Sequence, residues 1–220
     1  MLLRGSISLL IVAALLFVPA GSLSYWQGWA FLGLVLAIVL FMGTYLLKRD
    51  PELLRRRMLH REKRPEQRRL KGIGVVVTLA SLLLSGLDHR FGWSRAWVGP
   101  VPGWLSLVAL GAVAGFYVFI FWVLSVNRFA ARVIQVEPNQ PVVSTGPYRV
   151  VRHPMYAGSV VLWLSVPVAL GSYVASPVSA LLIPIFVLRL LYEERFLRRE
   201  LPGYGDYCER TRYRLIPFVW

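Results

Sequence analysis

The sequence has very little of what proteins use to build disulfides and metal sites. Its 220 residues include one cysteine, Cys208, and three histidines, His60, His89 and His153, which lie far apart. A single cysteine excludes an intrachain disulfide, and the histidines lack the spacing of metal ligands. We therefore expect no metal site.

Charge is also scarce. Only 16% of the residues are charged and 56% are hydrophobic, whereas soluble domains carry about a quarter charged residues. The formal net charge is nevertheless +14. The basic residues fall between apolar segments, where the positive-inside rule and anionic lipid headgroups account for them. We therefore expect a protein of the membrane bilayer, with no nucleic-acid partner.

Six apolar segments follow one another along the chain, and several approach the roughly 20 residues that a membrane-spanning helix needs. The segments cover about residues 6–23, 29–47, 72–87, 103–126, 155–171 and 173–192. This pattern predicts an all-α fold, a polytopic transmembrane helical bundle of five to six membrane helices. We expect one domain, 1–220, with an N-terminal part (1–71), central helices (72–134) and a catalytic region (135–220).

The last apolar stretch, residues 155–192, is too long for one crossing. As a single helix it would measure about 57 Å, nearly twice the hydrocarbon thickness. Gly171, between Pro167 and Pro177, is typical of a turn. The sequence therefore predicts a helical hairpin, which returns its two ends to the same side of the membrane.

Charge also predicts the orientation. Residues 48–71 contain eleven basic and four acidic residues, a bias typical of a cytoplasmic loop. With six crossings, both termini, the basic loops and the polar residues near 146–158 would face the cytoplasm. The C-terminal tail alternates arginines with leucines and aromatics, so we expect an amphipathic segment on the cytoplasmic interface.

The predicted hairpin brings charged groups of both signs together at its open end. The helix that begins at His153 and Pro154 offers backbone donors to an anion, reinforced by Arg152. Glu193 and Glu194 lie near the end of the other helix, where the dipole disfavours acids and a cationic partner is expected. S-adenosylmethionine is a molecule that carries both kinds of charge.

Two stretches carry a family resemblance: "VVSTGPYRVVRHPMYAGSVVLWLSVPVALGS" and, downstream, "LRLLYEERFLRRELPGYGDYCERTRYRLIP". Together they resemble the C-terminal half of the isoprenylcysteine carboxyl methyltransferase family, with looser similarity at "GLDHRFGWS" and Asn127. The family consists of integral membrane enzymes that bind S-adenosylmethionine in a cytoplasm-facing pocket. The resemblance therefore implies S-adenosyl-L-methionine as the cofactor.

The resemblance also implies a set of site residues. Arg189 falls where the family places an arginine needed for the substrate, and Glu193 would contact the cofactor. Gln140 stands where relatives often have histidine. The remaining positions implied for the cofactor pocket are Gln135, Val142, Val143, Tyr148, His153, Pro154, Met155 and Tyr156.

We therefore expect a methyltransferase that acts on a lipid-linked or amphipathic acceptor. A carboxylate acceptor would need Arg189 to orient it, whereas an amine acceptor would need a base, for which Glu194 is the candidate. The alternatives are a phospholipid amine N-methyltransferase and a non-catalytic lipid-binding or assembly protein. The acceptor and the oligomeric state stay open.

Overall fold

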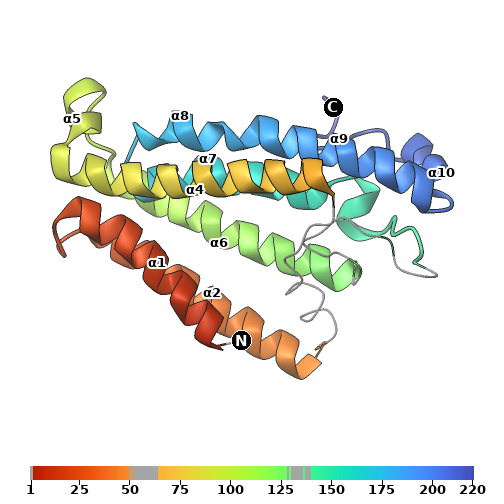
Figure 1. The fold of residues 1–220 in the computed structure, drawn as a ribbon, viewed down its shortest axis with the longest axis horizontal. Helices are drawn as coiled ribbons and strands as arrows, with labels where there is room; N and C mark the ends of the chain where they lie inside the picture. The colour runs from red at the N-terminus through yellow and green to blue at the C-terminus, as the bar shows by residue number, and fades with distance from the viewer. Residues whose placement is uncertain (1, 50, 52–63, 128, 130–135, 137–139) are drawn as a thin grey trace.

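The computed structural model describes the chain except residues 1, 50, 52–63, 128, 130–135 and 137–139. Long helices run back and forth along the molecule, so that neighbours in the sequence are antiparallel (Figure 1). The described ranges contain no β-strand. The long helices are α1 (Leu2–Ala20), α2 (Trp26–Arg49), α4 (Pro65–Phe91), α6 (Gly103–Val126), α7 (Pro154–Ala169) and α9 (Leu182–Glu200).

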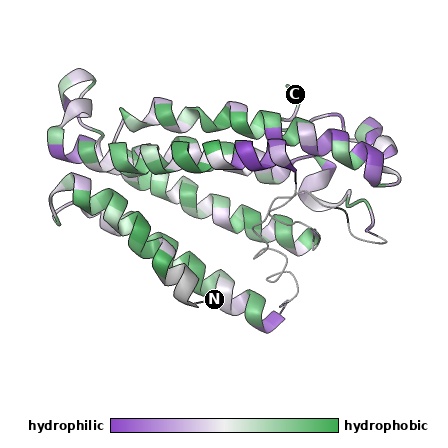
Figure 2. Cartoon of the chain, in the orientation of Figure 1, coloured by the Kyte–Doolittle hydropathy of each residue, from purple (hydrophilic) through white to green (hydrophobic). Residues whose placement is uncertain are grey.

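Apolar surface along these helices explains their arrangement. Three helices, α2, α4 and α6, are long and apolar enough to cross a membrane, as is the unit of α8 (Ala175–Ala180) and α9. The apolar parts of α1 and α7 are shorter. Hydrophobic residues cover most of the bundle, while hydrophilic residues gather where α4 begins and α9 ends (Figure 2). The predicted all-helical, multi-pass membrane fold is confirmed.

Helices α1 and α4 pack closely because α4 has a glycine at their contact. A Cβ atom on Gly86 would lie 2.5 Å from the carbonyl oxygen of Leu16. Small residues allow this close backbone approach, which is a usual means of packing helices in membranes. The helix pair α1–α2 is thereby attached to the rest of the bundle.

The predicted hairpin is present. Helix α7 ends at Ala169, a turn follows, and α8 and α9 return along α7 (Figure 1). Gly171 in the turn has φ of +74°, a conformation that favours glycine. The hairpin therefore has a closed end at this turn and an open end at Pro154 and Glu200.

A buried carboxylate fastens the closed end to α4. Asp88 accepts hydrogen bonds from the backbone N–H of Ser94, at 2.7 Å, and from the hydroxyl of Ser172, at 2.5 Å; the Ser94 hydroxyl also donates to it. Ser94 lies in α5 (Trp93–Trp97), and its hydroxyl oxygen accepts the N–H groups of Tyr173 and Val174. Every member of this network has a partner, so the turn is held rigidly against α4 and α5.

The C-terminal tail, predicted to be amphipathic, packs one face against the open end of the hairpin. After α10 (Tyr204–Arg210), the chain folds back over the start of α7. The N–H groups of Arg152 and His153 donate to the carbonyl oxygens of Tyr213 and Arg214, at 2.9 and 3.0 Å. Four buried side chains pack into a small core: Leu201, Tyr204, Tyr207 and Cys208. The apolar face of α10 therefore packs against other residues of the protein.

Candidate functional site

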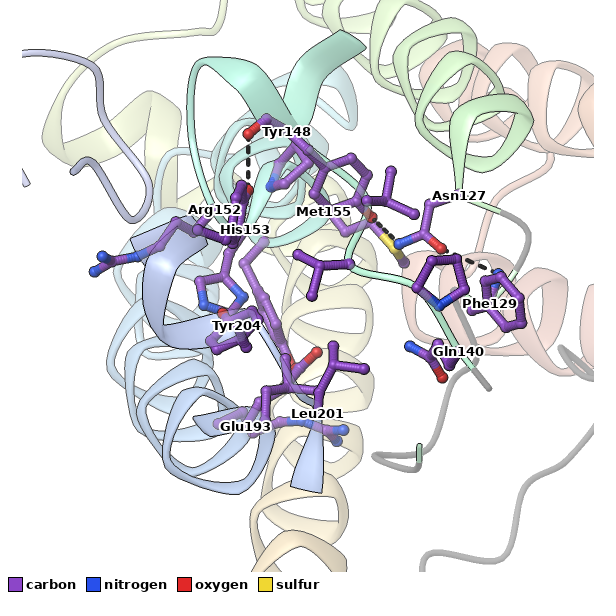
Figure 3. Close-up of a pocket in the computed structure, with 18 of the residues that line it drawn as sticks. Asn127, Phe129, Gln140, Tyr148, Arg152, His153, Met155, Glu193, Leu201 and Tyr204 are labelled. Carbon is purple, nitrogen blue, oxygen red and sulfur yellow. Dashed lines mark hydrogen bonds between the residues drawn. The ribbon is translucent and has the colours of Figure 1, made fainter. Parts of the chain in front are cut away.

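The open end of the hairpin contains a cavity of about 410 Å³. Its wall comes from α4, α7, α9, α10 and the chain that follows α6. Arg152, His153 and Tyr204 lie on one side and Asn127, Phe129 and Gln140 on the other (Figure 3). The cavity thus lies where the polar end of the bundle meets its apolar helices.

The structure brings together nearly all the residues that the sequence predicts for the site. Gln135 is outside the described residues, and Glu194 does not line the cavity. The predicted residues that do line it are Gln140, Val142, Val143, Tyr148, His153, Pro154, Met155, Tyr156, Arg189 and Glu193.

Tyr156 and Glu193 join the two helices of the hairpin across the cavity. The Tyr156 hydroxyl donates to Oε2 of Glu193 at 2.8 Å. Tyr156 lies in the first turn of α7, and Glu193 lies in the second half of α9. The hydrogen bond fixes the Glu193 carboxylate at the cavity wall, where it can meet a cationic group of a ligand.

His153 is the N-cap residue of α7 and is buried, with 5% of its surface exposed. Burial lowers the pKa of His153 to about 4, and the opposing effect of Glu194 is smaller. Its imidazole is therefore neutral near pH 7. The Nε2 atom is buried and has no hydrogen-bond partner among the described residues. An orphaned polar atom in a cavity wall is costly unless a ligand or water pairs with it.

Tyr204, in α10, is a second residue with such a buried polar atom. Its hydroxyl is buried in the wall of the same cavity and also has no partner in the described part of the chain. Burial raises the pKa of Tyr204, so the hydroxyl stays protonated and can donate. His153 and Tyr204 line the same cavity (Figure 3). Together they offer a neutral polar patch for a ligand.

Two predictions about charge at this end need correction. Arg152 is 7% exposed, and its Nε lies 2.7 Å from Oε1 of Glu194. The N–H groups of Arg152 and His153 already donate to the tail. Arg152 is therefore not placed to reinforce an anion site, because Glu194 and the carbonyl oxygens of Cys208 and Thr211 engage its guanidinium.

The second prediction that needs correction is that Glu194 acts as the base. Its other oxygen, Oε2, accepts from Nε of Arg214 at 2.8 Å, and the side chain is 4% exposed. A carboxylate held between two guanidinium groups and directed away from the cavity has no free oxygen with which to take a substrate proton. Glu194 is thus placed to brace the tail against α9, and the geometry does not support the base that the sequence predicts.

Several lining residues were not in the predicted set, among them Lys71, Phe129, Ser159, Phe186, Tyr204 and Tyr207. The aromatic residues of "GYGDY" were visible in the sequence, but their direction depends on the fold of the tail. Tyr207 donates to the carbonyl oxygen of Tyr148 at 2.7 Å, and the Tyr148 hydroxyl accepts from Asn127 at 3.0 Å (Figure 3). This chain of contacts connects α10 to the end of α6.

The fold and the cavity define a class: a polytopic helical membrane protein whose last hairpin holds a polar ligand site at one end. Residues 104–202 match the phospholipid methyltransferase family. This family is one of membrane methyltransferases of the isoprenylcysteine carboxyl methyltransferase type, so the resemblance seen in the sequence is confirmed. The matched region runs from α6 to the end of α9 and contains most of the cavity wall.

A curated relative is the cobalt-zinc-cadmium resistance protein CzcN of Cupriavidus metallidurans (strain CH34). The two sequences are 30% identical over 141 residues, which cover 62% of this chain and 58% of the relative. The chain therefore spans less than two thirds of the length of this relative.

Proposed function

We propose that this protein transfers a methyl group from S-adenosylmethionine to a lipid-linked or amphipathic acceptor. The observation that carries the proposal is the cavity, most of whose wall belongs to the family-matched region and which is lined by a fixed carboxylate, a guanidinium and two side chains with buried, unpartnered polar atoms. Its volume of about 410 Å³ lies within the roughly 300–1,000 Å³ of ligand pockets.

The residues in the wall fit such a cofactor. Glu193 can pair with a cationic group, and Tyr156 keeps its carboxylate in place. His153 and Tyr204 can hydrogen-bond neutral polar atoms, since both side chains are uncharged near pH 7. When bound, the cofactor supplies an activated methyl group on a sulfonium.

Arg189 would orient the acceptor. It lines the cavity one helical turn before Glu193, and a guanidinium binds a carboxylate through two parallel hydrogen bonds. A carboxylate is already ionised near neutral pH and needs no base, which suits a site whose predicted base, Glu194, is occupied by two arginines. Holding the nucleophile in line then supplies much of the rate acceleration. We therefore favour a carboxylate over an amine acceptor.

Calorimetric titration of detergent-purified protein with S-adenosylmethionine and its demethylated product tests the cofactor. We expect binding to wild type and at least tenfold weaker binding to Glu193→Gln. Glu200→Gln is a matched control, because Glu200 is an exposed carboxylate on the same helix. Equal affinity in Glu193→Gln would remove Glu193 from the site, and no binding to folded wild type would refute the cofactor.

The acceptor role of Arg189 has a separate test. Arg189→Ala should depress labelled methyl transfer to amphipathic carboxylates by more than tenfold while the cofactor affinity stays within twofold. Arg199→Ala, which removes an exposed arginine of α9, should leave transfer unchanged. Unaltered transfer in Arg189→Ala would contradict the role. Cofactor binding without transfer to any acceptor would instead favour the non-catalytic alternative.

We further propose that the cavity end faces the cytoplasm, because the most basic stretch of the sequence, residues 48–71, joins α2 to α4 at that end. Single cysteines placed at position 200 or position 97 in a Cys208→Ser background test this. A membrane-impermeant thiol reagent applied from outside intact cells should label position 97 and spare position 200. The reverse pattern would overturn the orientation.

A further inference from the structure

The Tyr156 hydroxyl contacts both of the charged α9 side chains to which the proposed function assigns ligands. It donates to Oε2 of Glu193 at 2.8 Å. Arg189 interacts with the same hydroxyl, through its positive charge and as a hydrogen-bond donor. A hydroxyl has one hydrogen to donate and two lone pairs that accept, so both contacts can exist at once. Tyr156 is therefore a neutral group between a guanidinium and a carboxylate.

The spacing of residues on α9 explains how one hydroxyl reaches both side chains. Arg189 and Glu193 are four residues apart on this helix, and residues at that spacing lie on the same face. Both side chains line the cavity, and Tyr156 approaches them from α7, the other helix of the hairpin. The part of the wall assigned to the acceptor and the part assigned to the cofactor thus share one contact.

Two aromatic contacts hold the Tyr156 ring. Its centre lies 5.9 Å from the centre of the His153 imidazole and 6.1 Å from that of the Phe186 ring, distances that are typical of stabilising aromatic pairs. His153 is the N-cap residue of α7, and Phe186 lies in α9 about one turn before Arg189. The ring is therefore held from both helices of the hairpin, and its packing defines where the hydroxyl lies.

A chain of hydrogen bonds of this kind transmits a change at one end to the other. A donor to the hydroxyl oxygen polarises the O–H group and strengthens its own donation, so the two bonds support each other. A cation that binds Glu193 neutralises part of the carboxylate charge, which weakens both bonds and leaves the Arg189 guanidinium freer to pair with an anion. By linkage, an anion on Arg189 favours the cation on Glu193 to the same degree.

We propose that Tyr156 is a positioning residue that couples the binding of the cofactor to the binding of the acceptor. Cofactor on Glu193 prepares Arg189 for the carboxylate of the acceptor through the Tyr156 hydroxyl, and the reverse also holds. The identity of the two ligands rests on the proposed function. The new property is cooperation: each ligand binds more tightly when the other is present, so the complete complex forms in preference to either partial one.

Paired titrations measure this coupling without turnover. The probes are dodecanoate, below its micellar concentration, and sinefungin, an unreactive analogue of S-adenosylmethionine that carries an ammonium in place of the sulfonium. Saturation with sinefungin should make wild type bind dodecanoate at least fivefold more tightly, and saturation with dodecanoate should tighten sinefungin by the same factor.

Tyr156→Phe keeps the ring and removes only the hydroxyl, and it should reduce the coupling factor to below twofold. The factor is a ratio within one variant, so a change in the affinity for a single ligand does not alter it. A merely structural role of Tyr156 would weaken the single affinities and leave the ratio at its wild-type value. Tyr156→Leu, which also lacks the hydroxyl, is a second variant if Tyr156→Phe purifies poorly.

Tyr192→Phe is the matched control, because Tyr192 is an exposed tyrosine beside Glu193 on α9 and is not among the described residues that line the cavity. It should keep the wild-type factor. A wild-type factor in Tyr156→Phe would show that the coupling passes directly between the ligands or their charged partners, and it would overturn the role of Tyr156. An equal loss in Tyr192→Phe would overturn it as well.

The same titrations distinguish this coupling from the proposed function. If wild type binds sinefungin and dodecanoate independently of each other, Tyr156 couples nothing, while the proposed function is supported. If folded wild type binds no sinefungin, both the coupling and the proposed cofactor are wrong. A coupling that is present in wild type and lost in Tyr156→Phe supports both.

Discussion

The two ends of the α7–α9 hairpin differ in how their buried carboxylate, hydroxyl and imidazole groups are hydrogen-bonded. At the closed end, Asp88, Ser94 and Ser172 satisfy one another and the backbone of the turn. At the open end, His153 Nε2 and the Tyr204 hydroxyl are buried without hydrogen-bond partners among the described residues, in side chains that line the cavity. Satisfied polar groups inside a membrane bundle hold the fold, whereas unsatisfied ones that line a cavity indicate a ligand.

Glu193 and Glu194 are adjacent carboxylates at the open end. Substituting them tests this comparison and should give the largest change in unfolding free energy. Glu194→Ala leaves two guanidinium groups without their partner, and breaking such a buried pair costs about 4 kcal/mol of unfolding free energy. Glu193→Gln should leave stability nearly unchanged and reduce ligand affinity. Unfolding titrations of both variants, with Glu200→Ala as the exposed control, measure the difference. Equal losses of stability in the two variants would contradict this separation of roles.

The closed end should respond to Asp88→Ala with a loss of stability alone. The substitution removes the acceptor of three hydrogen bonds, and we expect a loss of about 3 kcal/mol, since each orphaned donor costs on the order of 1 kcal/mol or more. The folded fraction should bind S-adenosylmethionine with wild-type affinity. A tenfold loss of affinity in folded protein would show that the two ends are coupled.

The pH dependence of stability tests the open end. Free histidine titrates near 6.5, whereas burial lowers the pKa of His153 to about 4. Between these values the unfolded chain takes up a proton that the folded protein does not. Stability should therefore fall as pH decreases below 6.5, by about 2 kcal/mol at pH 5. His153→Gln should reduce this slope in unfolding titrations at pH 7 and pH 5, and an unchanged slope would contradict a buried neutral imidazole.

A substitution in the turn at Gly171 should give the smallest change in unfolding free energy. Gly171 has φ of +74°, and a Cβ atom there would lie 2.9 Å from Nε2 of Gln27. Gly171→Ala should cost about 1 kcal/mol, because a side chain disfavours this conformation and Gln27 has to move. Gly92, which has a similar φ of +67° but open space around it, gives a comparison for the backbone effect alone. An equal loss in Gly92→Ala would show that the Gln27 contact contributes nothing.

Much of this arrangement could be predicted from the sequence, because hydrophobicity and turn residues are local signals. The six apolar segments and the turn at Gly171 predict the bundle and its final hairpin, and the hairpin brings Tyr156 and Glu193 together. The separate roles of Glu193 and Glu194 could not be predicted in this way. Successive residues on a helix point about 100° apart, so only packing decides which carboxylate faces the cavity.

The tail and α4 show a second limit of sequence analysis. The backbone pairing of Arg152 and His153 with residues 213 and 214 depends on the path of the chain after Gly203, which no periodic pattern records. Lys71 is equally hidden, since its neighbours in the sequence are also basic. Its place in the wall follows from the register between α4 and α9, which is a property of two helices far apart in the sequence.

The 16-residue length of α7 has a consequence for the surrounding bilayer. At 1.5 Å per residue the helix measures about 24 Å, roughly 6 Å less than a typical hydrocarbon layer. This hydrophobic mismatch requires either local thinning of the lipid or a cavity that begins below the headgroup plane. In both cases a lipid-linked acceptor of the kind proposed above would reach Pro154 without lifting its head into bulk water. Turnover in vesicles should then decline as the acyl chains of the host lipid lengthen, which would make bilayer thickness a determinant of rate.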